Sequence, residues 1–157
     1  MKRVVKFRGK SLYDKYPKAN GGFEIPQGAF VYGNLVVDMN GNPQIDIQGY
    51  IDGNSFHHSL WVDADTVGQF TGLLDRNGKE IYEGDICSLE YNHGFFYMSV
   101  EWNEESAHFG FRLKGENHVG CSDAFCDWIK TKRVSVIGNI YDNPELLKGG
   151  KYGNQEV

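Results

Sequence analysis

Short runs in which apolar and polar residues alternate recur along the whole chain, and turn-forming residues separate them. A period of two residues is typical of half-buried β-strands, whose successive side chains point to opposite faces. In the first run Val5 and Phe7 fall on one face, and Lys6 and Arg8 on the other. The pattern predicts an all-β, mainly antiparallel fold with strands at residues 4–8, 30–37, 44–48, 55–62, 86–91, 95–102, 109–113 and 134–140.

Turn chemistry joins these runs into hairpins. Asn40-Gly41 stands between the second and third runs, and residues 92–94 stand between the fifth and sixth. Asn-Gly pairs favour tight hairpin turns because both residues tolerate positive φ. Residues 9–28 mix glycine, proline, asparagine and charge without a period, and they are predicted to be a loop.

Two segments look helical. Ser122 could cap a short helix in which Phe125, Trp128 and Ile129 fall on one stripe. Residues 142–147 place Asn143 before Pro144, a pattern that favours the start of a short C-terminal helix. The polar, glycine-rich residues 149–157 are predicted to be a flexible tail.

Residues 66–86 hold the densest turn chemistry and three carboxylates, Glu80, Glu83 and Asp85. In extended backbone Glu83 and Asp85 would share a face, where a pair of acids could catalyse hydrolysis or hold a hard cation. Perturbed carboxylates need burial that turns seldom give, so architecture is the preferred interpretation. We therefore expect no catalytic residue, and a structural turn motif made of Asp75, Asn77, Gly78, Gly84 and Asp85.

Metal and cofactor sites have little support in the sequence. His118, Cys121 and Cys126 have a spacing that lacks the two close ligand pairs of a structural zinc site. Asp75 begins a stretch resembling a calcium loop, but glycine and the final acid are absent at the required positions. We expect no metal and no cofactor, and we interpret the three cysteines as reduced, mostly buried thiols.

Composition agrees with a soluble β protein. The chain has 157 residues, of which 40% are hydrophobic and 24% charged, with 20 glycines and 14% aromatic residues. Glycine and aromatic residues together favour turns and half-buried sheet surfaces. The sequence has neither a signal-peptide core nor a membrane-length apolar run, so a cytoplasmic protein without membrane contact is expected.

Charge is distributed unevenly. Residues 1–20 carry seven Lys or Arg against one acid, whereas residues 21–157 carry nine against twenty acids. The basic strand suits either a solvated or intersubunit face, which is preferred, or a phosphate-binding edge. Candidate contacts for a partner or for nucleic acid are Lys2, Arg3, Lys6, Arg8 and Lys10.

The aromatic residues between positions 95 and 111 also allow two interpretations. They could stack on bases, or they could fill the core of a small barrel. Glu101, Glu104 and Glu105 lie close by in the sequence and would repel phosphate, so the core is preferred.

Several stretches together resemble the YopX-like family of phage and prophage proteins. They are residues 6–10, 31–35, 67–73, 75, 77–86 and 137–146. The resemblance implies a β-rich fold, a phage or prophage gene and residence in the bacterial cytoplasm, and it supplies no catalytic residues. Residues 83–86, Glu-Gly-Asp-Ile, are also similar to the entry to the first strand of a Src-homology-3-like small barrel, and on that analogy residues 81–141 form a five-stranded barrel. The expected division is an N-terminal β subdomain at 1–72, a barrel subdomain at 73–148 and the tail.

These observations favour a non-enzymatic binding protein. Its expected partner is a host or phage protein, and self-association is a further expectation. The alternative is a nucleic-acid-binding protein that uses the basic N-terminal strand, and the net charge of −5 weighs against it.

Overall fold

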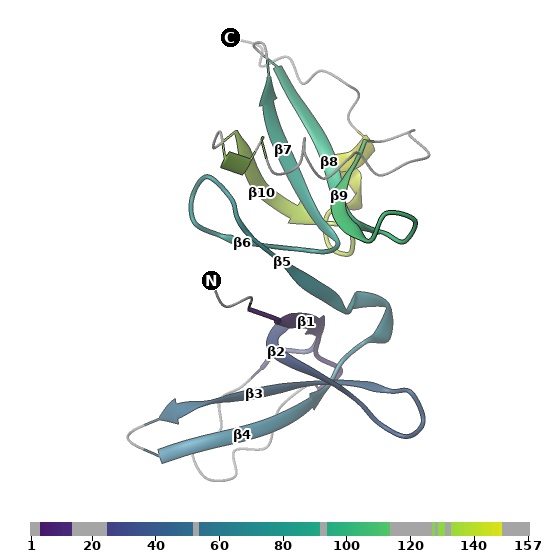
Figure 1. Ribbon diagram of the computed structural model, residues 1–157. Coiled ribbons are helices and arrows are strands. Elements are labelled where there is room, and N and C mark those ends of the chain that lie inside the picture. The colour runs from purple at the N-terminus through teal and green to yellow at the C-terminus, as the bar shows by residue number, and fades with distance from the viewer. Residues whose placement is uncertain are drawn as a thin grey trace. The chain divides into compact units, whose positions relative to one another are not determined.

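The structure is a computed structural model of the whole chain. It describes residues 4–13, 25–51, 54–91, 94–113, 127, 129–130 and 133–148. The chain divides into two compact units, Met1–Phe70 and Thr71–Val157. Each unit is built on antiparallel strands (Figure 1). Within the described residues no helix has the length and apolar character that crossing a membrane requires.

The first unit is a twisted antiparallel sheet with strand order β4-β3-β2-β1-β5. Figure 1 shows β3 and β4 as a long hairpin. The sheet packs one apolar face on a core of Ile25, Val31, Ile45, Leu60 and Val62. Its elements are β1 (Phe7–Lys10), β2 (Phe30–Val37), β3 (Pro43–Ile51), β4 (Asn54–Trp61), a 3-10 helix at Ala64–Thr66 and the start of β5 (Gly68–Leu74).

Strand β2 changes partner in its middle. Its first half pairs with β1 and its second half with β3. Gly33 lies at the change, and a Cβ atom there would lie 1.9 Å from the carbonyl oxygen of Asp46. Only glycine allows the two backbones to approach so closely.

The second unit contains a four-stranded antiparallel sheet with order β10-β7-β8-β9, and a short β5–β6 hairpin. Register places Cys87 opposite Met98 and Val100 opposite Phe111, so one face of the sheet is apolar and forms the core. Its elements are the end of β5, β6 (Glu80–Tyr82), β7 (Asp85–Tyr91), β8 (Gly94–Asn103), β9 (His108–Leu113), β10 (Val134–Asn139) and a 3-10 helix at Pro144–Lys148.

The predicted fold class is confirmed, since both sheets are antiparallel and helices are few. The predicted short C-terminal helix is a 3-10 helix. The closed barrel and the division into domains at residue 72 stay predictions. The described part of the second unit forms an open four-stranded sheet, and the two compact units divide between Phe70 and Thr71.

The first strand was predicted too early. Val5 is 55% exposed and precedes β1, which begins at Phe7 and continues to Lys10. The extension arises because Gly9 and Lys10 pair with Val31 and Phe30, a long-range ladder that overrides the local loop pattern. Residues 9 and 10 therefore belong to a strand.

Some predictions fall mainly outside the described residues. In the predicted helix near residue 122, only Asp127, Ile129 and Lys130 are described; they are helical, and Ile129 packs on the core of the second unit. The tail and the zinc candidates His118, Cys121 and Cys126 lie outside the described residues, as do Lys2 and Arg3.

Candidate functional site

The basic side chains of β1 lie over aromatic rings of β2. The antiparallel register places Arg8 opposite Tyr32 and Lys10 opposite Phe30. Because residues two apart share a strand face, Lys6 lies on this face too. The Nζ atom of Lys6 is 5.6 Å from the centroid of the Tyr32 ring. We call these five residues the basic–aromatic face.

Two of the three cations, Arg8 and Lys10, lie over the ring of Phe30. The Cζ atom of Arg8 lies 4.5 Å from the centroid of this ring, and the Nζ atom of Lys10 lies 5.6 Å from it. Cations over aromatic faces gain electrostatic attraction, which grows as water is excluded. The rings therefore hold the positive charges of Lys6, Arg8 and Lys10 in place.

Burial separates the roles of the three cations. Arg8 is only 4% exposed, so the expectation of a solvated strand face is wrong at this position. Its planar, weakly hydrated guanidinium tolerates burial against a ring better than an ammonium does. Lys6 and Lys10 are half-buried and Tyr32 is 45% exposed, so these three residues carry the accessible part of the face.

Asp75 organises the turn between β5 and β6. Its Oδ1 atom accepts hydrogen bonds from the backbone N–H of Asn77 at 2.8 Å and of Lys79 at 2.9 Å. Its Oδ2 atom accepts the N–H of Val136 in β10 at 3.0 Å. Burial alone would raise the pKa of Asp75, but the bonds from Val136, Lys79 and Asn77 outweigh it and hold the pKa below its ordinary value.

The same turn covers an edge of β10. The N–H of Arg76 donates to the carbonyl oxygen of Val134 at 3.0 Å, next to the bond between Asp75 and Val136. A strand edge with unpaired backbone groups invites pairing with other chains. Asp75 and Arg76 satisfy two such groups, so this part of the motif is structural.

The second half of the motif forms another turn. Gly84 has φ +80°, donates its N–H to the carbonyl oxygen of Val100 and accepts the N–H of Ile140. Asp85 is buried, and its Oδ2 atom accepts the N–H of Tyr82 at 2.8 Å. Glu83 lies in the turn, so the extended backbone that would place it on one face with Asp85 is absent. The hypothesis of a carboxylate pair loses its geometric basis.

A second polar cluster lies on the β3–β4 hairpin. The Nε2 atom of His57 is 3.2 Å from Oδ2 of Asp46, and Ser59 is the register partner of Asp46. The hydrogen bond from Ser59 lowers the pKa of Asp46, burial opposes this, and His57 adds to the lowering. Here the carboxylate lies between serine and histidine, whereas nucleophilic catalysis needs the imidazole there.

The described residues contain no group of three or more His, Cys, Asp or Glu side chains that could hold a metal ion. His57 and His58 lie on opposite faces of β4, as adjacent strand residues do. His57 contacts Asp46, and the ring of His58 stacks on Phe56 at a centroid distance of 5.8 Å.

The aromatic residues of β8 and β9 divide between core and surface. Phe111 is buried and Phe96 packs on the core, but Trp102 is 41% exposed. Trp102 contacts Phe109 edge to face at a centroid distance of 4.9 Å. The expectation that these aromatic residues lie in the core is correct for Phe111 and wrong for Trp102, because alternation does not indicate where a core ends.

The fold and these contacts define a protein of two antiparallel β units, in which the polar residues of the family-like motif serve the architecture. Residues 31–148 match the family described as YopX protein, and the chain belongs to this family. It is 26% identical over 106 residues to the SPbeta prophage-derived uncharacterized protein YopX of Bacillus subtilis (strain 168), a match that covers 64% of this chain and 67% of that protein.

A solved structure has a similar fold. The crystal structure of protein EF1440 from Enterococcus faecalis superposes with a TM-score of 0.52 at 22% sequence identity. The match covers 93% of this chain and 99% of that one. At this identity the likeness concerns the fold and carries no activity with it.

Proposed function

We propose that this chain is a phage- or prophage-encoded binding protein without enzymatic activity, which acts in the bacterial cytoplasm on a host or phage protein. The prophage origin of the Bacillus subtilis relative supports the setting. Membership of the family, which residues 31–148 match, supports the same phage or prophage setting.

The basic–aromatic face is the observation that carries the binding role. Cations held over rings present charge and apolar area together, and aromatic residues such as Tyr32 are enriched where proteins bind partners. By contrast, the carboxylates of the motif are engaged in the turns: Asp75 accepts three backbone N–H groups, and Asp85 accepts another. An acidic protein surface suits the face by charge complementarity.

Capture of the tagged chain from phage-infected bacteria, with and without nuclease treatment, tests this proposal. We expect discrete proteins to be retained after nuclease and to be lost with the variant Lys6→Glu/Lys10→Glu. The matched control is Lys130→Glu/Arg133→Glu, which changes the charge equally at two exposed positions of the second unit. Retained proteins that do not respond to the first variant would contradict the assignment of the face.

The same face supports a second candidate function, binding of single-stranded nucleic acid. Lys6, Arg8 and Lys10 lie beside the rings of Phe30 and Tyr32 on one face of the sheet. Cations beside aromatic rings are the arrangement that holds a phosphate backbone and stacks bases. Titration with labelled single-stranded oligonucleotides would then show affinity that falls steeply with salt. The absence of binding at low ionic strength would eliminate this candidate.

A further inference from the structure

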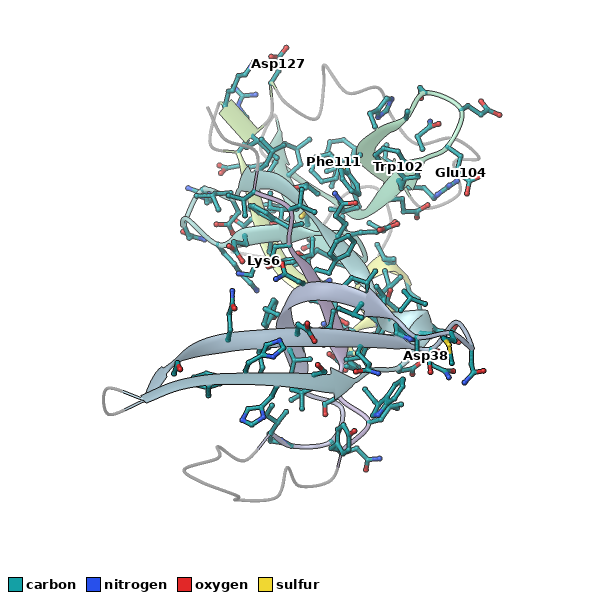
Figure 2. All side chains as sticks on the ribbon, turned by 60° about the horizontal axis from the view of Figure 1, so that its bottom comes forward. Lys6, Asp38, Trp102, Glu104, Phe111 and Asp127 are labelled. Carbon is teal, nitrogen blue, oxygen red and sulfur yellow. The ribbon has the colours of Figure 1, made fainter. Side chains whose placement is uncertain are left out.

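The hairpin between β8 and β9 carries a compact acidic surface. Glu104 and Glu105 are exposed in its turn, directly after β8. Trp102 and Phe109 pack edge to face at the base of the turn. Figure 2 shows Trp102 and Glu104 at this hairpin. We call Trp102, Glu104, Glu105 and Phe109 the acidic tip.

The two glutamates are the accessible acids of this region. Glu101, which lies in β8, accepts a hydrogen bond from Ser99 at 2.7 Å and pairs with Arg112 at 2.5 Å. Within the described part of the chain, no such ion pair involves Glu104 or Glu105, whose side chains lie at the surface. Their charges are therefore available to a partner.

The acidic tip and the basic–aromatic face have matching chemistry. Each combines aromatic area with charge, and the signs are opposite: Glu104 and Glu105 on one, Lys6 and Lys10 on the other. An exposed Trp is the residue type most enriched among those that dominate binding energy. Complementary charges around such an anchor set the orientation and speed the encounter.

We propose that the acidic tip of one copy docks on the basic–aromatic face of a second copy. This inference rests on the binding role proposed for that face. Two copies can dock reciprocally about a two-fold axis, or they can join head to tail, in which case successive copies close into a ring or extend as a linear assembly. Salt weakens the contact because both surfaces are exposed to solvent.

A charge-exchange experiment tests this contact. Variant A is Lys6→Glu/Lys10→Glu, which leaves both surfaces acidic. Variant B is Glu104→Lys/Glu105→Lys, which leaves both surfaces basic. Multi-angle light scattering should show the unaltered chain above its monomer mass of 17.8 kDa at low salt, and at that mass in high salt. Each variant alone should be monomeric at low salt, and an equimolar mixture of A and B should assemble again.

The mixture separates a contact between copies from any effect within one chain. Reassembly requires the acidic face of A to meet the basic tip of B, and the acidic tip of A to meet the basic face of B. The control Asp127→Lys/Glu145→Lys makes the same charge change as B at other exposed positions of the same unit, and it should assemble normally. Circular dichroism establishes that each variant is folded.

An unaltered chain that is monomeric at low salt would overturn the inference, and so would folded variants whose mixture stays monomeric. If variant A fails to fold, variant B and its control still test the contact, because B changes only exposed residues. Assembly of variant B alone at low salt would also overturn the inference. Failure here leaves the proposed function intact if the captured proteins still depend on Lys6 and Lys10.

Discussion

Two turns in this chain have nearly the same sequence and geometry but different surroundings. Residues 38–42 read Asp-Met-Asn-Gly-Asn, and residues 75–79 read Asp-Arg-Asn-Gly-Lys. In both, Oδ1 of the aspartate accepts the N–H groups two and four residues later, at 2.8–2.9 Å. In both, the glycine has positive φ, +86° at Gly41 and +82° at Gly78.

The second carboxylate oxygen distinguishes them. Oδ2 of Asp38 accepts the side-chain amide of Asn42, within the same turn. Oδ2 of Asp75 accepts the N–H of Val136, 61 residues away in β10. Figure 2 shows Asp38 at the turn of the β2–β3 hairpin. The same local chemistry makes a self-contained turn in one unit and a tertiary link in the other.

Replacement of Asp75 should have the largest effect. Asp75→Ala removes a buried acceptor and leaves three backbone N–H groups without it, at a cost on the order of 3 kcal/mol in the free energy of unfolding. Urea denaturation measures this loss. Asp38→Ala, the matched control, should cost much less because the loss stays within a surface turn. Equal losses would contradict the distinction between the turns.

The pH dependence of stability should follow Asp75. Its folded pKa lies below the ordinary value of 3.8, so its contribution is present above that pH and is lost as pH falls through the lowered folded pKa. Stability should fall between about pH 5 and pH 2, and Asp75→Asn should flatten this fall. Urea denaturation at several pH values measures the free energy of unfolding of the unaltered chain and of Asp75→Asn. The same dependence on pH in both proteins would refute the assignment to Asp75.

The glycines should behave alike. Gly41 and Gly78 both have positive φ and open space where a Cβ would stand, so only backbone strain opposes alanine. Gly41→Ala and Gly78→Ala should each cost about 1 kcal/mol in the free energy of unfolding. Thermal denaturation measures both. A much larger loss of stability for Gly78→Ala than for Gly41→Ala would contradict the claim that the two turns have the same local geometry.

The exposed ion pair beside the second turn should matter least. Arg76 lies 3.3 Å from Glu90, and both side chains are largely exposed. Arg76→Ala should cost about 0.5 kcal/mol or less, because solvent screens the pair and the bond from the backbone N–H to Val134 remains. A loss comparable to that of Asp75→Ala would assign the link to the side chain of Arg76.

The sequence predicted much of the fold because the signals were local. Asn40-Gly41 with alternating runs on both sides correctly identified the β2–β3 hairpin. The runs at 86–91 and 95–102 correspond to β7 and β8. The alternating run at 109–113 corresponds to β9. In each case neighbouring residues determine the outcome.

Long-range contacts were beyond local patterns. The bond between Asp75 and Val136 joins residues far apart in sequence, so the tertiary role of the turn could not be inferred from its own residues. Likewise, the alternating pattern predicted Arg8 on the solvated face of its strand. In the structure Arg8 is buried over the ring of Phe30, which belongs to another strand. The sequence indicated the basic residues of β1 and the aromatic residues of β2, but it did not indicate the register that pairs them.

Amide hydrogen exchange at Val136, measured by NMR, tests most directly the claim that the family motif links its turn to β10. Asp75→Ala should accelerate exchange of the Val136 N–H strongly, whereas Asp38→Ala should leave it unchanged. Unchanged protection of Val136 in a folded Asp75→Ala variant would contradict the link, and with it the structural role assigned to the motif.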